Sequence, residues 1–483
     1  MIEIHKLSDL VYDEIIEVQQ SKINQSNDRP AVENKIRKLV FFVMAEGISR
    51  TFAKINSKRD KQFVFNKYHT TIRLKYKDKI YINYSTQTSE NIDDFIVKNN
   101  FIEWDDEPKA SNTPDNMFNQ FLPYYDNTLS TNKTIQLAIK ELPPLFSEET
   151  IFAKGVFIYG LGDYSRVYIA PNIKKLEKIF CVDYVANISS FYKKKYGYSY
   201  NGIVPQDSYH VLRKVSKPMA IIATYHSDHT RIAEEIYHQN PKSLIFIEKP
   251  PCVTLKDITN LANLYRKGAN IEIGYNRRFI KINQIIKKRL NGQRAIINIS
   301  VKEILISENH WYFWQNQGTR ITGNLTHWID LCNYWLEDEI PAEITMLKSN
   351  TKDETFTTSI LYSNGSLVNL TVSDKGNALR GVQEKIEIRT KDESYFIDDY
   401  LRTYIIHNNG RKENFNKILR SKGHDEMYRH VMELYHNKTE FRYSINDLIK
   451  TALTTLYVSE MFKNTTNHFD CKDAISKMLN EYN

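Results

Sequence analysis

Two short segments of the sequence carry ionisable side chains at spacings that suit proton transfer. In the first, Glu248 and Lys249 follow an apolar run and precede two prolines. A lysine at the end of a buried strand can lower the pKa of a substrate hydroxyl and stabilise the alkoxide that forms. In the second, His327 and Asp330 are three residues apart, so they share a face if the segment is helical. We expect Lys249 to polarise a substrate oxygen and His327 to handle its proton, with Asp330 and Glu248 in support.

Both segments also have a plainer interpretation. Glu248 and Lys249 are equally consistent with a surface ion pair before a proline-rich turn. The segment around His327 is also typical of an amphipathic helix with Trp328 in the core, in which His327 merely makes a hydrogen bond. His226 and His229 form a short HxxH pair without further spaced ligands, so we expect no metal site.

A glycine-rich loop precedes both segments. It has the sequence Gly-Leu-Gly-Asp-Tyr-Ser over residues 160–165. Gly160 permits a tight turn, Gly162 leaves room for a pyrophosphate, and Ser165 is small enough for helix–strand packing. Asp183 follows at the distance where a carboxylate accepts hydrogen bonds from a ribose and repels a 2′-phosphate. We therefore expect NAD(H) rather than NADP(H). The expected cofactor-binding residues are Gly160, Gly162, Asp163, Tyr164, Ser165, Asp183, Thr224, Glu248 and Lys249.

The elements that position these residues follow from the hydrophobic pattern. Apolar runs at 155–159, 178–183, 218–224 and 243–248 alternate with helical stretches. Strands separated by helices predict a parallel, doubly wound sheet of the α/β class. Further on, alternating patterns predict strands at 294–304, 355–362 and 366–373, the last two joined by a hairpin turn, and a helical stretch at 426–461.

The first 150 residues have a different pattern. Residues 31–54 have helical periodicity, whereas residues 62–68 and 71–84 predict strands, the latter folded into a hairpin. Residues 105–125 are polar and contain three prolines, which favours a loop. We expect a small α+β domain over residues 1–150 that carries no recognisable chemistry.

Charge and composition narrow the function. The chain of 483 residues has a formal net charge of +8. Residues 1–150 carry −2 and residues 151–483 carry +10, which suits an anionic small molecule. No arginine-rich run predicts nucleic-acid binding, and no apolar run is long enough to predict a membrane span. The four cysteines are far apart, so we expect a reducing, cytoplasmic location.

Taken in order, these features resemble the glucose–fructose oxidoreductase/inositol dehydrogenase (Gfo/Idh/MocA) family over about residues 151–483. Residues 1–150 fall outside the resemblance. The landmarks that agree are Gly160-Leu-Gly162, Asp183, Ile222-Ala-Thr224 with His229, Glu248-Lys-Pro250, Gly274-Tyr-Asn-Arg-Arg-Phe279, the segment from Gly318 to Asp330, and Lys422-Gly-His424.

The resemblance implies a Rossmann domain over residues 151–273 and an α+β domain with an open mixed sheet over residues 274–483. Family members use NAD(H) or NADP(H) and act on sugars, cyclitols, nucleotide-sugars and some imines. The motif lysine and histidine correspond to Lys249 and His327. Many members have a carboxylate three or four residues before the histidine, where this chain has Asn324 and Gly323. The resemblance also implies a homodimer or homotetramer.

The substrate is expected to be anionic and sugar-like, such as a nucleotide-sugar. Aromatic faces suit sugar C–H groups, and arginines can bind a phosphate or carboxylate. The alternatives are reduction of a C=N bond, with residues 1–150 docking a carrier or partner protein, and a non-catalytic Rossmann-fold scaffold. The expected substrate-binding residues are Tyr275, Arg277, Arg278, Trp311, Arg320 and Asn324.

Overall fold

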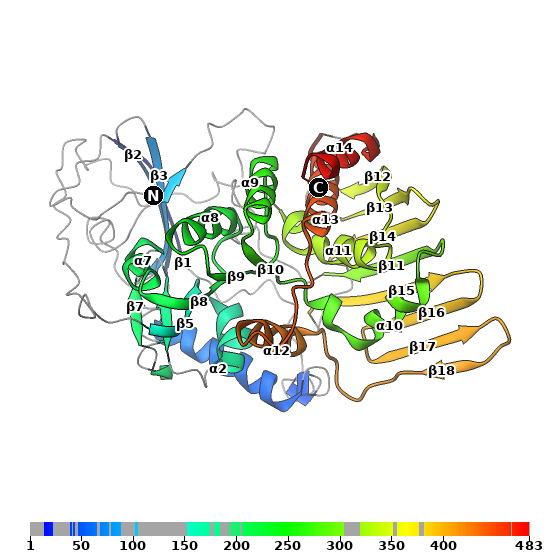
Figure 1. Cartoon of the computed structure of the whole chain (residues 1–483), viewed down its shortest axis with the longest axis horizontal. Coiled ribbons are helices and arrows are strands. Elements are labelled where there is room, and N and C mark those ends of the chain that lie inside the picture. Colours follow the sequence, from blue (N-terminus) through cyan, green and yellow to red (C-terminus); the bar gives the residue numbers. More distant parts are fainter. Residues whose placement is uncertain are drawn as a thin grey trace. The chain divides into compact units, whose positions relative to one another are not determined.

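Figure 1 shows the computed structural model of the chain. Its residues group into two compact units. The first unit comprises Met1–Asp28, Ile55–Asp163 and Leu176–Pro218, and the second comprises Arg29–Lys54, Tyr164–Lys175 and Met219–Asn483. Each unit therefore includes segments of more than one predicted domain. The structure describes residues 14–22, 39–40, 42–43, 47–64, 68–76, 79–87, 102–104, 152–173, 178–183, 192, 195–197, 199–202, 205–303, 319–350, 355–375, 381–464 and 466–482.

The first unit contains a four-stranded antiparallel sheet in the order β1-β2-β3-β4. Tyr76 pairs with Lys79 across the hairpin, which confirms the prediction for residues 71–84. The predicted strand at 62–68 is wrong over residues 62–64, which end helix α2 (Ile48–Val64). A helix that has already formed gains a hydrogen bond with each added residue and has no new nucleation cost. The strands are β1 (Glu14–Lys22), β2 (Tyr68–Tyr76), β3 (Lys79–Gln87) and β4 (Ile102–Trp104).

A parallel sheet of six strands has the order β10-β9-β8-β5-β6-β7. Counted along the chain, this is the 3-2-1-4-5-6 order of a Rossmann fold. The predicted doubly wound α/β sheet is confirmed, and β8 contributes residues to both units. The strands are β5 (Phe152–Tyr159), β6 (Ile179–Val182), β7 (Tyr200–Gly202), β8 (Val215–Ile222), β9 (Leu244–Ile247) and β10 (Asn270–Ile273).

Helical segments connect these strands. A π-turn, η1 (Ser165–Ile169), continues directly into the short helix α5 (Ala170–Ile173) after β5. Helix α9 begins at a capping box, in which the side chains of Thr254 and Asp257 each bond the other's backbone N–H. The remaining segments are η2 (Pro205–Ser208), α7 (Tyr209–Leu212), η3 (His226–Asp228), α8 (His229–Gln239), α9 (Leu255–Arg266), η4 (Asn276–Phe279) and α10 (Lys281–Leu290).

The second unit also contains a nine-stranded mixed sheet, in the order β18-β17-β16-β15-β11-β14-β13-β12-β19. Only the β11–β14 pair is parallel among its described neighbours. This confirms the predicted open mixed sheet and the hairpin between β13 and β14. Along β13, buried and half-buried residues alternate strictly, as one covered face requires. The strands are β11 (Ile296–Lys302), β12 (Pro341–Asn350), β13 (Thr355–Tyr362), β14 (Leu367–Ser373), β15 (Gln383–Arg389), β16 (Glu393–Asp398), β17 (Arg402–His407), β18 (Lys412–Asn414) and β19 (His468–Asp470).

Helices cover one face of this sheet (Figure 1). The π-turn η6 (Ile321–Leu325) leads into α11 (Thr326–Trp335), which packs against α13 (Ile445–Asn464). The helical stretch predicted at 426–461 is two helices, α12 (His424–Tyr435) and α13. Ser444 ends the connection by capping α13 through Asp447. The last helix is α14 (Lys472–Tyr482), and it packs on α13.

Two further observations concern the described residues as a whole. None of their helices is both long and apolar enough to cross a bilayer. All four cysteines are buried thiols without a disulfide.

Candidate active site

The conformation of the glycine loop after β5 is fixed by its backbone, and the loop leaves space beside Gly162. Gly160 has a φ of 86°, which a residue with a side chain adopts only under strain. The Leu161 N–H donates to a carboxylate oxygen of Asp183 at 2.7 Å, so the acid at the end of β6 fixes the loop. Gly162 is exposed, and a Cβ added there would meet nothing within 4 Å. Packing within the protein therefore gives Gly162 no reason to be glycine, whereas a phosphate approaching the backbone would.

This loop fits a dinucleotide. Gly162 leaves the space that a pyrophosphate needs, and Asp183 is half-buried at the end of its strand. The other residues predicted to bind the cofactor differ in exposure. Asp163 is exposed and Ser165 is buried, while Thr224 is half-buried and its carbonyl bonds the His229 ring at 3.2 Å.

Lys249 lies two residues beyond the end of β9. Its ammonium donates to the carbonyl oxygen of Gly323, in η6, at 2.8 Å. Burial lowers the pKa of Lys249, while the charge of Glu248 opposes that change. The hydrogen bond links the lysine to the turn that leads into α11. Lys249 and His327 are therefore brought together from segments that are far apart in the sequence.

Glu248 lies inside the second unit. Its carboxylate accepts a hydrogen bond from the hydroxyl of Tyr428 on α12, and Tyr164 also bonds it. A Cβ at Gly274 would lie 3.0 Å from a Glu248 oxygen, so glycine makes room for this carboxylate. Burial raises the pKa of Glu248, which favours the protonated form relative to an exposed glutamate.

His327 is on the first turn of α11, and its Nδ1 has no hydrogen-bond partner among the described residues. Burial lowers its pKa well below the usual value, and the positive charges of Arg277 and Lys249 lower it further. The imidazole is therefore neutral at physiological pH, the form that can accept a proton. The edge of its ring faces Tyr275, with the ring centroids 6.2 Å apart.

The structure gives Asp330 a different partner from the one expected. Both carboxylate oxygens accept hydrogen bonds from Arg278, at 2.9 and 2.7 Å, and Arg278 also bonds Asp447 at 3.0 Å. The charged groups of this trio lie in the core, where leaving one unpaired would be costly. Asp330 therefore anchors α11 through Arg278, and Nε and Nη2 of Arg278 are both bonded to buried carboxylates.

Arg277 is also engaged inside the protein. Its guanidinium donates twice to Glu384, at 2.8 and 3.0 Å, and lies 4.4 Å from the ring centroid of Trp328. Burial alone would raise the pKa of Glu384, but the positive charges of Arg277 and Lys422 lower it to about 2. The predicted contact of Arg277 with substrate is thus replaced by a buried ion pair.

The other expected substrate-binding residues have mixed positions. Tyr275 is buried and its hydroxyl bonds Thr326 at 2.7 Å, which argues against direct contact with substrate. Arg320 is buried at the start of η6, and Asn324 is half-buried within it. Trp311 lies outside the described residues.

Three charged or titratable residues near Lys249 and His327 were not predicted to act there: Glu303, Lys422 and His424. The positive charge of Lys422 lowers the pKa of His327, as does electrostatic repulsion from His424 when that imidazole is protonated. In the sequence, Lys422 and His424 belong only to a landmark of the family resemblance. Glu303 had a usable signal, because it continues the inward-facing series Ile297, Ile299 and Val301 of β11.

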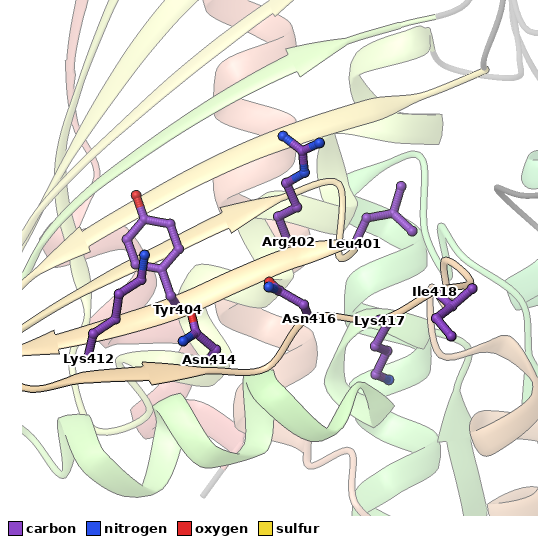
Figure 2. Close-up of a pocket in the computed structure, with 8 residues that line it drawn as sticks. All are labelled: Leu401, Arg402, Tyr404, Lys412, Asn414, Asn416, Lys417 and Ile418. Atoms are coloured by element: carbon purple, nitrogen blue, oxygen red, sulfur yellow. The ribbon is translucent and has the colours of Figure 1, made fainter.

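A surface pocket lies elsewhere, along β17 and β18 (Figure 2). It has a volume of about 470 Å³, and Lys412 lies over the Tyr404 ring at 3.9 Å from the centroid. None of the predicted site residues lines it. Among the described residues, no cluster of three or more His, Cys, Asp or Glu side chains is arranged to hold a metal ion.

Comparison with known proteins rests on structure. No protein-family model matches the sequence, and no curated protein matches it either. Several solved structures that resemble its fold are oxidoreductases or dehydrogenases. The fold is that of the Gfo/Idh/MocA oxidoreductases.

Three of these structures illustrate the extent of the Gfo/Idh/MocA fold. The aldose-aldose oxidoreductase of Caulobacter crescentus, complexed with glycerol, has a TM-score of 0.55 and 16% identity over 65% of this chain and 99% of its own. GenD2 from gentamicin A biosynthesis, in complex with NAD, has a TM-score of 0.54 and 14% identity over 66% of this chain and 97% of its own. The dehydrogenase MviM of Clostridium difficile has a TM-score of 0.51 and 17% identity over 64% of this chain and 99% of its own.

Proposed function

We propose that this protein is a nicotinamide-dependent oxidoreductase that moves a hydride between the cofactor and a carbinol or carbonyl carbon. The observation that carries the proposal is the pairing of Lys249 with the Gly323 carbonyl at 2.8 Å, four residues before a neutral His327. This arrangement provides one donor that can stabilise an oxyanion and one base that can take a proton.

The protein side of the reaction follows from these two groups. For oxidation, Nδ1 of His327 accepts the hydroxyl proton, and the Lys249 ammonium stabilises the negative charge that develops on oxygen. When bound, the nicotinamide supplies the acceptor for the hydride and its electron pair. The Gly323 carbonyl orients Lys249 but has no proton-accepting role at neutral pH, so proton transfer depends on His327 and Lys249.

We further propose NAD(H) as the preferred cofactor and a sugar-like substrate, including nucleotide-linked sugars. Asp183, which bonds the glycine loop, would repel a 2′-phosphate. GenD2, a structural neighbour, was solved with NAD, and another neighbour is an aldose-aldose oxidoreductase. The net charge of +10 over residues 151–483 supports an anionic substrate. Arg277 and Arg278 are each paired with buried carboxylates, so we expect other cations to contact that anion.

The first test is calorimetric titration of the purified protein with NAD(H) and NADP(H), after a spectroscopic check for cofactor carried through purification. We expect tight NADH binding and weak NADPH binding. The reverse preference would keep the oxidoreductase proposal and overturn the role of Asp183. Failure to bind either form, with none carried over, would favour a non-catalytic scaffold.

Variants then test the catalytic roles. Lys249→Met and His327→Ala should each abolish turnover in a screen of sugar substrates while leaving cofactor affinity within about threefold of the original. Lys256→Met is the matched control, because Lys256 is an exposed lysine on α9. Full activity of both site variants on an identified substrate would refute the catalytic roles of Lys249 and His327.

A further inference from the structure

A buried carboxylate lies beside Lys249 and has no part in the mechanism above. Glu303 follows the last residue of β11, and its side chain is fully buried. Its backbone N–H donates to the Ser373 carbonyl at 2.8 Å, which continues the β11–β14 pairing by one residue. Pairing of the backbone therefore fixes the position of Glu303 at the end of the sheet.

The side chain of Glu303 is connected to the turn that holds Lys249. Nδ2 of Asn324 donates to Oε2 of Glu303 at 3.0 Å. Asn324 is the neighbour of Gly323 in η6, and the Gly323 carbonyl accepts the Lys249 hydrogen bond. One short segment thus contacts the carboxylate through a side chain and the ammonium through its backbone.

The charged groups around Lys249 indicate that the Glu303 carboxylate helps to stabilise the charged form of the lysine. Two carboxylates, Glu248 and Glu303, favour the charged form of Lys249, while Arg277 disfavours it. Glu248 is bonded by Tyr428, and burial shifts it toward the protonated form. Burial raises the pKa of Glu303 as well, but the positive charges of Arg320, Lys249 and Arg277 oppose that change. Arg277 has its own ion pair with Glu384.

We infer that Glu303 is a positioning residue of this site: it keeps Lys249 protonated and, through Asn324, fixes the turn against which the ammonium is held. The catalytic meaning of this inference rests on the proposed function. In the reducing direction, a bound dihydronicotinamide would supply the hydride for the new C–H bond. The C=O π pair moves to oxygen, where the Lys249 ammonium stabilises the negative charge, and the O–H bond forms with the proton that His327 Nδ1 carries, which leaves a neutral imidazole. Glu303 then sets the pH above which the positive charge that stabilises this oxygen is lost.

The inference can be tested without turnover. The rate at which acetic anhydride acetylates Lys249, followed across pH by peptide mass spectrometry, reports the pKa of its amine. In Glu303→Gln we expect this pKa to fall by about one pH unit, because the nearby negative charge is gone. Glu272→Gln is the matched control, since Glu272 is a buried carboxylate bonded to the Arg442 N–H. An unchanged Lys249 pKa in Glu303→Gln would overturn the inference.

A second variant, in which the charge is exchanged between residues 303 and 324, tests the inference even if Glu303→Gln does not fold. In Glu303→Gln/Asn324→Asp the carboxylate moves to η6 and the amide to the residue after β11, so we expect the hydrogen bond to be retained with its direction reversed. We expect the Lys249 pKa and the alkaline limb of the reduction rate to return toward those of the original protein. No recovery, in a double variant with unaltered circular dichroism, would contradict the inference. Absence of cofactor binding would refute only the proposed function, because labelling of Lys249 is measured independently.

Discussion

Gly160 and Gly162 are two residues apart in one loop, yet the structure gives them different reasons to be glycine. Gly160 has a positive φ, so any side chain there strains the backbone of the loop. Gly162 has an ordinary φ and open space around its Cα. A side chain at Gly162 would therefore affect a bound ligand and leave the folded chain unstrained.

This difference predicts opposite results for two alanine variants. Gly160→Ala should lower the free energy of unfolding by about 1–2 kcal/mol, the cost of a left-handed conformation. Gly162→Ala should leave stability unchanged or slightly raised and weaken NAD(H) binding at least tenfold, because its methyl group occupies the space left for the phosphates. Urea unfolding and calorimetric titration separate the two effects. Unaltered NADH affinity in Gly162→Ala would contradict the assignment of the loop to a dinucleotide.

Residue types could be predicted from the sequence more readily than partners. Lys249 and His327 stood out because their surroundings suggested a strand end and a helix. The pairing of Asp330 with Arg278 could not be foreseen, because 52 residues separate the two side chains and several carboxylates could have taken that place. Glu303 was missed although the alternation of β11 places it on the buried face.

At the scale of elements, the start of α12 is fitted closely against η4. Gly423 has a φ of 83°, and a Cβ there would lie 2.2 Å from the backbone oxygen of Asn276. The Asn276 side chain donates to the Lys422 carbonyl at 2.5 Å, next to that contact. This junction positions His424 and Tyr428, the residues through which α12 reaches the candidate site.

Gly423→Ala should therefore be more damaging than loss of a positive-φ glycine alone. Gly410→Ala is the control, since Gly410 also has a φ of 80° but no atom within 4 Å of an added Cβ. We expect Gly410→Ala to cost about 1–2 kcal/mol and Gly423→Ala at least twice as much, because backbone atoms must move apart. Equal losses in urea unfolding would mean that the junction has room to relax.

Helices and strands could be predicted where the local hydrophobic pattern was strong. β5, β8 and β9 contain apolar runs that are buried in a parallel sheet, so they were predictable. β7 and β10 have only three and four residues, too few for a periodicity to show, and were not predicted. Helix α2 extends beyond its predicted end because helix propagation overrides a weak alternating pattern.

At the scale of the whole molecule, the chain is longer than the fold that it shares. The three solved structures above each match over at least 97% of their length but over about two-thirds of this chain. Residues 29–54, from the extra part, nevertheless belong to the second unit. Within it, Arg50 of α2 forms an ion pair with Asp425 at 2.6 Å and lies 5.1 Å from the Tyr168 ring centroid.

These contacts connect the extra region to the candidate site through an aromatic stack. Tyr168 stacks on His424 with a centroid distance of 4.3 Å. Burial lowers the pKa of His424 well below its usual value, and Arg50 is the first of the positive charges that lower it further. Arg50→Ala should therefore raise the pKa of His424, since one repelling charge is removed from the imidazolium.

NMR of the imidazole protons across pH measures the pKa of His424. A double-mutant cycle of Arg50→Ala and Asp425→Ala gives the coupling free energy between Arg50 and Asp425. We expect a coupling of about 0.5–1 kcal/mol, as for a partly exposed ion pair. Arg429→Ala is the control, because Arg429 is an exposed arginine on α12 itself. If Arg50→Ala and Arg429→Ala shift the pKa of His424 equally, the extra region has no specific electrostatic influence on the site. A shift confined to Arg50→Ala would mean that a segment outside the shared fold tunes a histidine beside Lys249 and His327.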